Sequence, residues 1–495
     1  MKIRAGLLAG ICAGALAVPA YAQDVTGDDS ESGIAENIDP SRVIIVTAQR
    51  QAQSLREVPI AVSAFDAEAL EAQQIENASD LQLTLPNVQF SKGNFTGASF
   101  TIRGIGDLCV GVSCDSATAI HLNDEPLFGT RLFETEFYDI ERIEVLRGPQ
   151  GTLFGRNATS GVVNIVTAKP KPGVFEASLD GEYGNFDAYK VKGMVNVPLG
   201  DTFAARVAGI YVKRDGYTRN TFTGNNIDGR DIYSIRGSLR WEPGPDTTID
   251  LLASYFREDD DRLRIQKQQC QEDPTGVLGC LNNRRDFGKT NTNAGFTGTL
   301  GSREFLITQG GPAFGAFGLN SLYGPNGHSN FTEPNDVRTV TTDFEPEYFS
   351  DELQLQGKVE HDFGPITAKL SGTYQETSID SRQDYNLSII DRTLYAPALG
   401  VLNVAPGFGP VAAAITPNGA AGQLCTSDTD PTGFGSFGGN RICANTPLSF
   451  DRSNSDNSAW SVEGIISSDL DGAFNFLLGG IYAESHLTEN SYYVN

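Results

Sequence analysis

Segments of alternating hydrophobicity are the feature that most restricts what this chain can fold into. From residue 174 onward, apolar residues recur at every second position in nine segments of about ten residues. These are residues 174–184, 188–198, 202–213, 232–242, 247–257, 349–362, 366–378, 458–469 and 473–485. The pattern predicts the antiparallel strands of a membrane β-barrel, with apolar side chains toward lipid and polar side chains toward a wet interior.

The connections between these segments separate a barrel from a soluble β-sandwich, whose strands also alternate. Short connections fall near residues 200–201, 243–246, 363–365 and 471–472. Between them lie long connections at about residues 214–231, 258–348 and 379–457. Short turns at one end and long loops at the other are typical of outer-membrane barrels. The first connection, residues 184–187, is a short exception on the side of the long loops.

Aromatic residues occupy matching heights in these segments. The end that leads into the long loops carries Tyr183, Tyr189, Tyr211, Tyr233, Tyr255, Phe349, Tyr374, Trp460 and Tyr482. The other end carries Phe175, Phe203, Trp241 and Phe474. Amphipathic rings settle at the two interfaces of a membrane, so these rows favour the barrel.

The beginning of the chain has the pattern of a secretory signal peptide. Lys2 and Arg4 precede an apolar stretch at residues 5–18, which is too short to cross a membrane as a helix. The small residues around Ala22 predict cleavage there, so residues 1–22 are the expected signal peptide. The net charge of −25 argues against nucleic-acid binding, which requires clustered basic residues.

The six cysteines beyond the signal peptide fall into local pairs. The candidate disulfide pairs are Cys109 with Cys114, Cys270 with Cys280, and Cys425 with Cys443. Disulfides are favoured because exported proteins meet an oxidising environment. Metal binding is the alternative, but no pair has CxxC spacing and the four histidines are scattered, so no metal site and no cofactor are predicted.

Residues 23–170 divide into three parts. Residues 23–42 are polar and acidic and are expected to form a disordered leader. An isolated β-branched run follows within residues 43–50, and residues 55–170 read as a compact α/β block. Strands are expected in that block near residues 141–146 and 161–167.

Two stretches of the α/β block resemble the plug domain of TonB-dependent receptors. They are residues 101–106, TIRGIG, and residues 140–161, IERIEVLRGPQGTLFGRNATSG. Residues 119–131 depart from the family's commoner aspartate-glycine turn. The resemblance implies a fold in which the N-terminal plug, residues 55–170, fills a membrane β-barrel whose first strands are residues 174–495. Because nine is an odd number and residues 491–495 run straight off a strand, we expect the chain to be a fragment or a truncated product.

The β-branched run looks like the family's TonB box. Its residues are Val43, Ile44, Ile45, Val46, Thr47 and Ala48. Such a segment can add as a strand to the sheet edge of a partner, here TonB with its inner-membrane energising complex. The alternative is that the run is an ordinary first strand of the plug.

The resemblance also implies that plug arginines pair with glutamates of the barrel and hold the plug in place. The candidates are Arg103 and Arg147 on the plug and Glu352 and Glu463 on the strands. Plain solvation in the lumen is an equal alternative for any single glutamate.

The implied function is energised import rather than catalysis. The resemblance predicts a receptor in the outer membrane of a Gram-negative bacterium that imports a scarce small ligand, with an iron–siderophore complex favoured. Importers of carbohydrate or aromatic ligands are the alternative, and a passive porin or adhesin is a weaker one. The sequence has no motif that pairs a nucleophile with a base, so no enzyme is predicted. The ligand is expected to contact the Cys109–Cys114 hairpin and the two longest loops.

Overall fold

A computed structural model gives the fold of most of the chain. It describes residues 44–92, 98–106, 116–128, 136–264, 271–272, 280–281, 296–327, 334, 336–385, 387–426, 441–472 and 474–494. The expected signal peptide, the leader, Val43, Cys109, Cys114 and Cys270 lie outside these residues. Among the described residues, no helix is long and apolar enough to cross a membrane.

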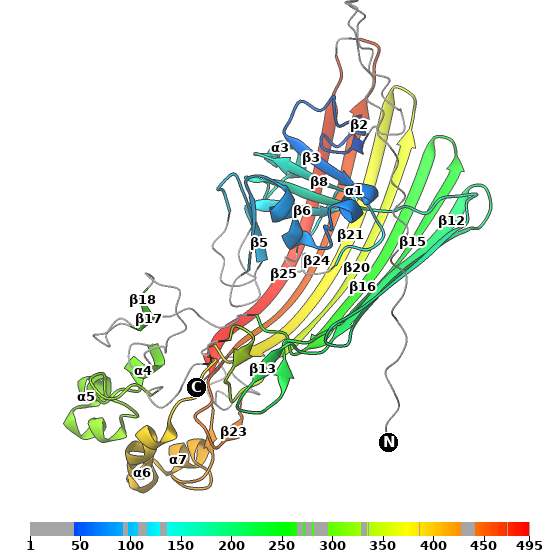
Figure 1. The fold of residues 1–495 in the computed structure, drawn as a ribbon. Helices are drawn as coiled ribbons and strands as arrows, with labels where there is room; N and C mark the ends of the chain where they lie inside the picture. The colour runs from blue at the N-terminus through cyan, green and yellow to red at the C-terminus, as the bar shows by residue number, and fades with distance from the viewer. Residues whose placement is uncertain are drawn as a thin grey trace, which may run out of the picture. The chain divides into compact units, whose positions relative to one another are not determined.

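One antiparallel sheet contains nine strands in chain order (Figure 1). They are β10 (Glu176–Gly184), β11 (Ala188–Pro198), β12 (Phe203–Arg214), β15 (Arg230–Gly244), β16 (Thr247–Asp260), β20 (Glu347–Asp362), β21 (Ile366–Gln383), β24 (Phe450–Ser468) and β25 (Leu477–Val494). Each predicted segment corresponds to one strand. Several strands extend farther toward the long loops than predicted, because backbone pairing continues past the apolar stretch, as between Arg382 and Arg452.

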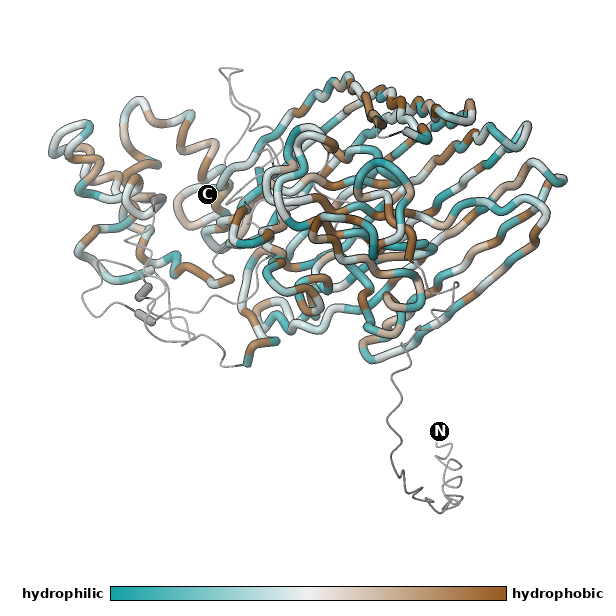
Figure 2. Tube along the Cα trace, turned by 90° about the horizontal axis from the view of Figure 1, so that it is seen from above, coloured by the Kyte–Doolittle hydropathy of each residue, from teal (hydrophilic) through white to brown (hydrophobic). Residues whose placement is uncertain are grey.

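The two faces of this sheet differ as the alternation predicts. Figure 2 shows hydrophobic and hydrophilic residues alternating along the strands. On one face, side chains such as Leu179, Leu370 and Leu478 are exposed, as expected for a surface that lies against lipid. On the other face, polar side chains such as Glu352 and Gln354 are buried, and the plug contacts this face, where the Phe128 amide donates to Gln375 on β21.

The plug contains a five-stranded sheet with the order β3-β8-β9-β6-β7. Its strands are β3 (Val62–Asp66), β6 (Thr118–Leu122), β7 (Glu125–Pro126), β8 (Ile140–Arg147) and β9 (Gly161–Thr167). The hairpin β4 (Val88–Lys92) and β5 (Ala98–Ile102) and the short helices α1 (Ala67–Ala72), η2 (Ala78–Asp80), α2 (Leu81–Thr84) and α3 (Gly151–Phe154) complete it. Phe100, Ile102 and Ile143 are fully buried at its core.

The glycine-rich stretch that suggested the plug has a packing role. Gly161 begins β9 against the end of β8, and a Cβ atom there would lie 2.2 Å from the carbonyl oxygen of Leu146. Gly148 has a φ of 119°, which few other residues adopt. The stretch therefore turns the chain sharply between two paired strands.

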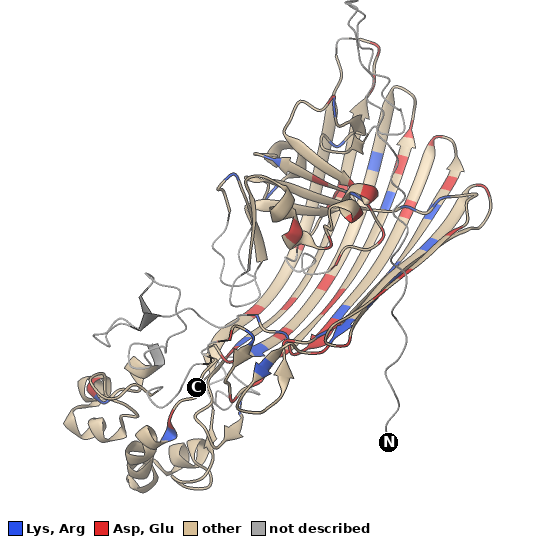
Figure 3. Ribbon diagram, in the orientation of Figure 1, with Lys and Arg blue, Asp and Glu red and all other residues tan. Residues whose placement is uncertain are grey.

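The two longest loops fold together. The first contains α4 (Phe296–Leu300), α5 (Arg303–Gly310) and η5 (Pro312–Phe317), and the second contains η6 (Arg392–Tyr395), α6 (Ala396–Val404) and α7 (Gly409–Ile415). The rings of Phe317 and Phe408 are 4.6 Å apart, and the amide of Asp391 donates to the carbonyl of Gly327 at 2.9 Å. Figure 3 shows few charged residues in this region. A disulfide joins Cys425 to Cys443 in the second loop, as one of the three expected pairs.

Candidate functional site at the interface of plug and strands

The β-branched run is packed onto the plug, and its described residues do not stand isolated in polar surroundings as the sequence suggested. β1 (Ile45–Val46) pairs with β2 (Gln53–Ser54) in an antiparallel hairpin. Val46 and Ala48 are fully buried in an apolar cluster with Leu146 and Val162 of the plug sheet. In this conformation the run is the edge of the plug.

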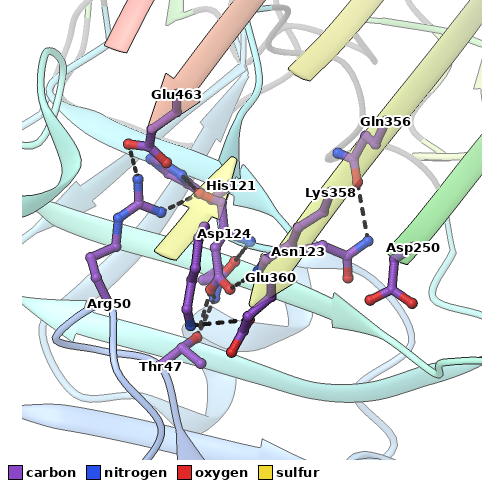
Figure 4. Close-up of polar contacts among 12 residues, drawn as sticks. Thr47, Arg50, His121, Asn123, Asp124, Asp250, Gln356, Lys358, Glu360 and Glu463 are labelled. Carbon is purple, nitrogen blue, oxygen red and sulfur yellow. Dashed lines mark hydrogen bonds and ion pairs between the residues drawn. The ribbon is translucent and has the colours of Figure 1, made fainter. Parts of the chain in front are cut away.

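Thr47 fixes the run to the plug through polar contacts (Figure 4). Its amide donates to Oε1 of Glu144 at 2.9 Å, and its hydroxyl donates to Oδ1 of Asp124 at 2.6 Å. The side-chain amide of Asn164 donates to the same Asp124 oxygen at 2.8 Å. Because Glu144 and Asn164 are completely buried, these hydrogen bonds satisfy groups that water cannot reach.

Arg50 connects the end of this segment to the strand wall. Its guanidinium forms an ion pair with Glu463 on β24, and the two side chains are only 4% and 11% exposed. The same guanidinium donates to the carbonyl oxygen of Asp124 at 2.5 Å and lies 5.1 Å from the ring centre of Phe154. A buried charge requires such partners, so the position of Arg50 depends on plug and wall together.

The turn between β6 and β7 is the third component of the site. Asn123 and Asp124 have φ values of 54° and 73°, a left-handed conformation that asparagine and aspartate tolerate well. The side chain of Asn123 donates to Oε1 of Gln356 on β20 at 3.2 Å, and Gln356 donates back to the carbonyl of Leu122 at 3.1 Å. Lys358 on β20 lies 3.5 Å from Asp124. This is the turn that departs from the aspartate-glycine pattern, and the side chains of Asn123 and Asp124 both contact β20.

Asp124 is held in its ionised form by this environment. Burial alone would raise the pKa of its carboxyl group, but Lys358, the Thr47 hydroxyl and Arg50 outweigh burial and hold the pKa far below its ordinary value. Asp124 is therefore a permanent negative charge between the run and β20.

Burial shifts the pKa values of two neighbouring groups, Glu125 and His121, toward their neutral forms. Burial raises the pKa of Glu125 to about 7, and a hydrogen bond from Ser371 only partly offsets this effect. Burial lowers the pKa of His121 to about 4. The neutral His121 ring uses its Nδ1 to donate to the carbonyl of Asp124 at 2.9 Å. A cavity of about 20 Å³ next to Glu125 is lined by Arg50, Asp124 and Glu463, among others, and is large enough for one water molecule.

A second polar anchor joins the plug to other strands. Arg206 on β12 donates from Nε to Oδ2 of Asp139 at 2.9 Å. Arg236 on β15 donates to the carbonyl oxygens of Tyr138 and Asp139 at 2.9 and 2.8 Å. The Tyr138 hydroxyl lies 2.7 Å from Oγ of Ser234. These contacts hold the plug on β12 and β15, in addition to the contacts on β20 and β24.

The structure assigns different partners to the predicted plug–strand pairs. Glu463 does reach the plug, but it pairs with Arg50 and not with Arg103 or Arg147. The Arg103 guanidinium lies beside Gly148 within the plug. Within the described part of the chain, neither Arg103 nor Arg147 forms an ion pair with Glu352, which instead lies 3.3 Å from the side-chain amide of Gln375. Arg50, Asp124, Arg206 and Arg236 were not predicted, because their partners are remote in the sequence.

A cavity of about 470 Å³ lies between the plug and the strand ends that lead into the long loops. Its plug side is formed by Asn77, Ser79, Phe90 and Glu136, and its strand side includes Tyr189, Lys190, Arg214, Arg230 and Arg262. Lys190 is held by Glu76 at 2.8 Å and by Glu136 at 3.0 Å. The lining therefore mixes charged side chains with aromatic and apolar ones. No group of three His, Cys, Asp or Glu side chains in the described residues could hold a metal ion.

Comparisons with known proteins agree with this arrangement. The sequence pattern of the TonB-dependent Receptor Plug Domain matches residues 54–162. The iron-regulated outer membrane virulence protein of Vibrio cholerae is 26% identical over 249 residues, which cover 48% of this chain and 36% of that protein. The pesticin receptor of Yersinia pestis is 26% identical over 236 residues, which cover 47% of this chain and 33% of that protein. The matched region thus spans about a third of the length of these relatives.

Solved structures show the same fold. The siderophore receptor PiuA from Acinetobacter baumannii gives a TM-score of 0.55 at 14% identity, covering 88% of this chain and 47% of that one. The ferripyoverdine receptor of Pseudomonas aeruginosa gives 0.54 at 12% identity, covering 90% of this chain and 45% of that one. At such low identity these likenesses show that the nine strands and the plug have the architecture of a plugged outer-membrane barrel.

Proposed function

We propose that this chain, which has the plug domain and barrel strands of a TonB-dependent receptor, imports a small ligand across the outer membrane using energy from TonB. The proposal is carried by one observation. The run that resembles a TonB box is continuous with the network that ties the plug to β20 and β24. A pull on this run acts directly on the contacts that keep the plug in place.

The mechanism follows from the character of those contacts. Strand addition by TonB requires free backbone groups on the run, but the run is paired with β2 and bonded through Thr47. Pulling must therefore first break the Thr47 and Arg50 contacts. Loss of Arg50 leaves Glu463 and Asp124 without a cation that they share, which weakens the hold of the wall on the β6–β7 turn.

We further propose where the protein works and what it carries. Residues 1–22 direct export, and the mature chain inserts in the outer membrane of a Gram-negative bacterium. The favoured ligand is an iron–siderophore complex. Support comes from the names of relatives, which include an iron-regulated outer membrane protein and a receptor bound to ferripyoverdine. The cavity of about 470 Å³ between plug and strands, with its mixed charged and apolar lining, has the size of a small-molecule site.

Deletion of residues 44–48 tests energised import. The full-length gene, with and without the deletion, is returned to a strain that lacks its own copy, and growth under iron limitation and on single carbohydrate or aromatic carbon sources is measured. We expect growth to depend on residues 44–48 and on an intact TonB. Growth that survives the deletion would show a passive pore, and a requirement only on one carbon source would replace iron with that ligand.

A further inference from the structure

A groove lies on the outward face of four strands, away from the plug. It has a volume of about 650 Å³, and its lining is mostly apolar. Val359 and Phe363 border it from the side of β20, Leu370 comes from β21, Ile466 from β24 and Leu478 from β25. These five side chains are exposed, so the groove opens outward and not into the lumen.

The strand register explains why the surface is hollow there. Leu370 lies opposite Gly464, and Gly464 lies opposite Gly480, so two neighbouring strands present no side chain at this level. The next pair toward the short turns is Ile466 with Leu478, and the next pair toward the long loops is Val462 with Tyr482. The glycine pair is therefore a pit with large apolar side chains on three sides.

Backbone geometry does not demand these glycines. A Cβ atom on Gly464 or on Gly480 would meet no heavy atom within 4 Å, and neither residue has a left-handed φ. A Cβ atom therefore fits at both positions, and a longer side chain there would project into the pit. The hollow is thus a property of the side chains alone.

The groove ends near the expected membrane interface. Phe363 and Phe474 are 63% and 71% exposed near the short turns, where interfacial aromatic rings are expected. Beside the groove, the ring of His361 lies 4.2 Å from that of Phe363, and its Nδ1 is 2.7 Å from the Thr247 hydroxyl. A polar ring at this height is in reach of lipid headgroups, while the glycine pit lies in the hydrocarbon region above it.

We propose that this groove binds one acyl chain of a phospholipid from the periplasmic leaflet, with the headgroup beside His361. The inference rests on the proposal that these strands cross the outer membrane, because only then is hydrocarbon the medium in contact with the groove. An unfilled pit forfeits dispersion contacts on its walls, and a flexible hydrocarbon chain can restore them. A lipopolysaccharide of the outer leaflet would not reach this depth.

Lipid retention by the purified protein tests the proposal. The protein is extracted in a mild detergent, washed extensively and examined by native mass spectrometry for bound phospholipid. We expect about one phospholipid per chain in the natural protein and about tenfold less in Gly480→Leu, since the new side chain displaces a few methylene groups. Gly237→Leu is the matched control, because Gly237 on β15 also has nothing within 4 Å of a Cβ and lies outside the groove. It should retain the lipid.

Several outcomes would overturn the inference without touching the proposed function. Folded natural protein that keeps only detergent, or Gly480→Leu that keeps as much phospholipid as the control, would show that the groove is no lipid site. A Leu478→Cys variant that cross-links to a second copy would give the groove a protein occupant instead. Failure of the proposed import looks different, because growth would then survive the deletion of residues 44–48 whether or not the protein retains phospholipid.

Discussion

Arg50 and Glu463 are 413 residues apart in the sequence and form a buried ion pair between the plug and β24. Each is the other's main charged partner at a place that water hardly reaches. The pair also touches the β6–β7 turn, because Arg50 donates to the carbonyl of Asp124. The segment next to the expected TonB-binding run therefore holds the plug against the strand wall. Loss of the Arg50–Glu463 pair should have a measurable effect on the stability of this segment.

Arg50→Met should loosen the first segment of the plug. The substitution leaves Glu463 buried without its cation, and breaking a buried pair in this way costs about 3–5 kcal/mol. We expect faster hydrogen exchange at residues 44–54, measured by mass spectrometry. Lys171→Met is the control, because Lys171 forms an exposed ion pair with Glu176 and its side chain is 57% accessible. Loss of such a pair should lower stability by less than about 1 kcal/mol. Equal exchange in both variants would contradict the structural role of Arg50.

Thr47→Val should weaken the same segment by a different route. The variant keeps the backbone bond to Glu144 but removes the hydroxyl that donates to Asp124, a loss of about 1–3 kcal/mol for a buried acceptor. We expect earlier cleavage near residues 51–53 in limited proteolysis. Thr84→Val, whose hydroxyl bonds only to Leu81 of its own helix, serves as the control and should leave that cleavage unchanged.

Glu125 should make plug stability depend on pH. Its pKa rises from an ordinary 4.5 to about 7 on folding, so between these values the folded plug holds a proton that the unfolded chain has lost. Stability must then fall as the pH rises through this window, by up to about 3 kcal/mol. Glu125→Gln should match the natural protein near pH 4.5 and be more stable at pH 8 in thermal unfolding.

The exposed Glu57 provides the comparison for that experiment. Glu57→Gln should have the same thermal stability as the natural protein at both pH values, because the Glu57 side chain is exposed and its replacement relieves no buried charge. If Glu125→Gln gained nothing at pH 8, the carboxyl group would ionise in the folded plug as readily as in the unfolded chain, contrary to the raised pKa.

Asp139→Asn should release the second anchor without the first. The substitution removes the charge that Arg206 binds and should raise hydrogen exchange at residues 136–140. Because this anchor uses β12 and β15 and the first uses β20 and β24, we expect the effects of Asp139→Asn and Arg50→Met to add. A strong departure from additivity in the double variant would mean that the plug moves as one rigid block.

Removal of the disulfide should affect the long loops only. With a separation of 18 residues between Cys425 and Cys443, its loss should cost about 3 kcal/mol in the local unfolding of the loop. Cys425→Ser with Cys443→Ser should increase proteolysis within residues 396–426, while cleavage of the plug stays unchanged. Altered plug cleavage would show that the loops and the plug are coupled.

Local patterns predicted the strands, and long-range contacts limited the rest. The nine strands follow from a two-residue period that is visible within each short segment from residue 174 onward. The glycine-rich stretch at residues 140–161 is sufficient by itself to indicate the plug. In contrast, nothing near Arg50 indicates Glu463. The sequence predicted that the β-branched run could add as a strand to a partner, which stays a prediction. In the structure Ile45–Val46 pairs with Gln53–Ser54, a pairing that depends on how the plug folds. Arg103 and Arg147 were predicted as plug–strand partners from the resemblance to the family. In the structure the Arg103 guanidinium instead lies beside Gly148 within the plug.

The contact between Phe317 and Phe408 has a consequence for how such receptors diversify. Because Phe317 and Phe408 pack against each other, replacing one loop alone would leave the ring of the other without its partner. A chimaera that takes residues 296–327 from a relative should fold its surface only if it also takes residues 396–426. Recombination between related genes would then be expected to exchange the two loops together.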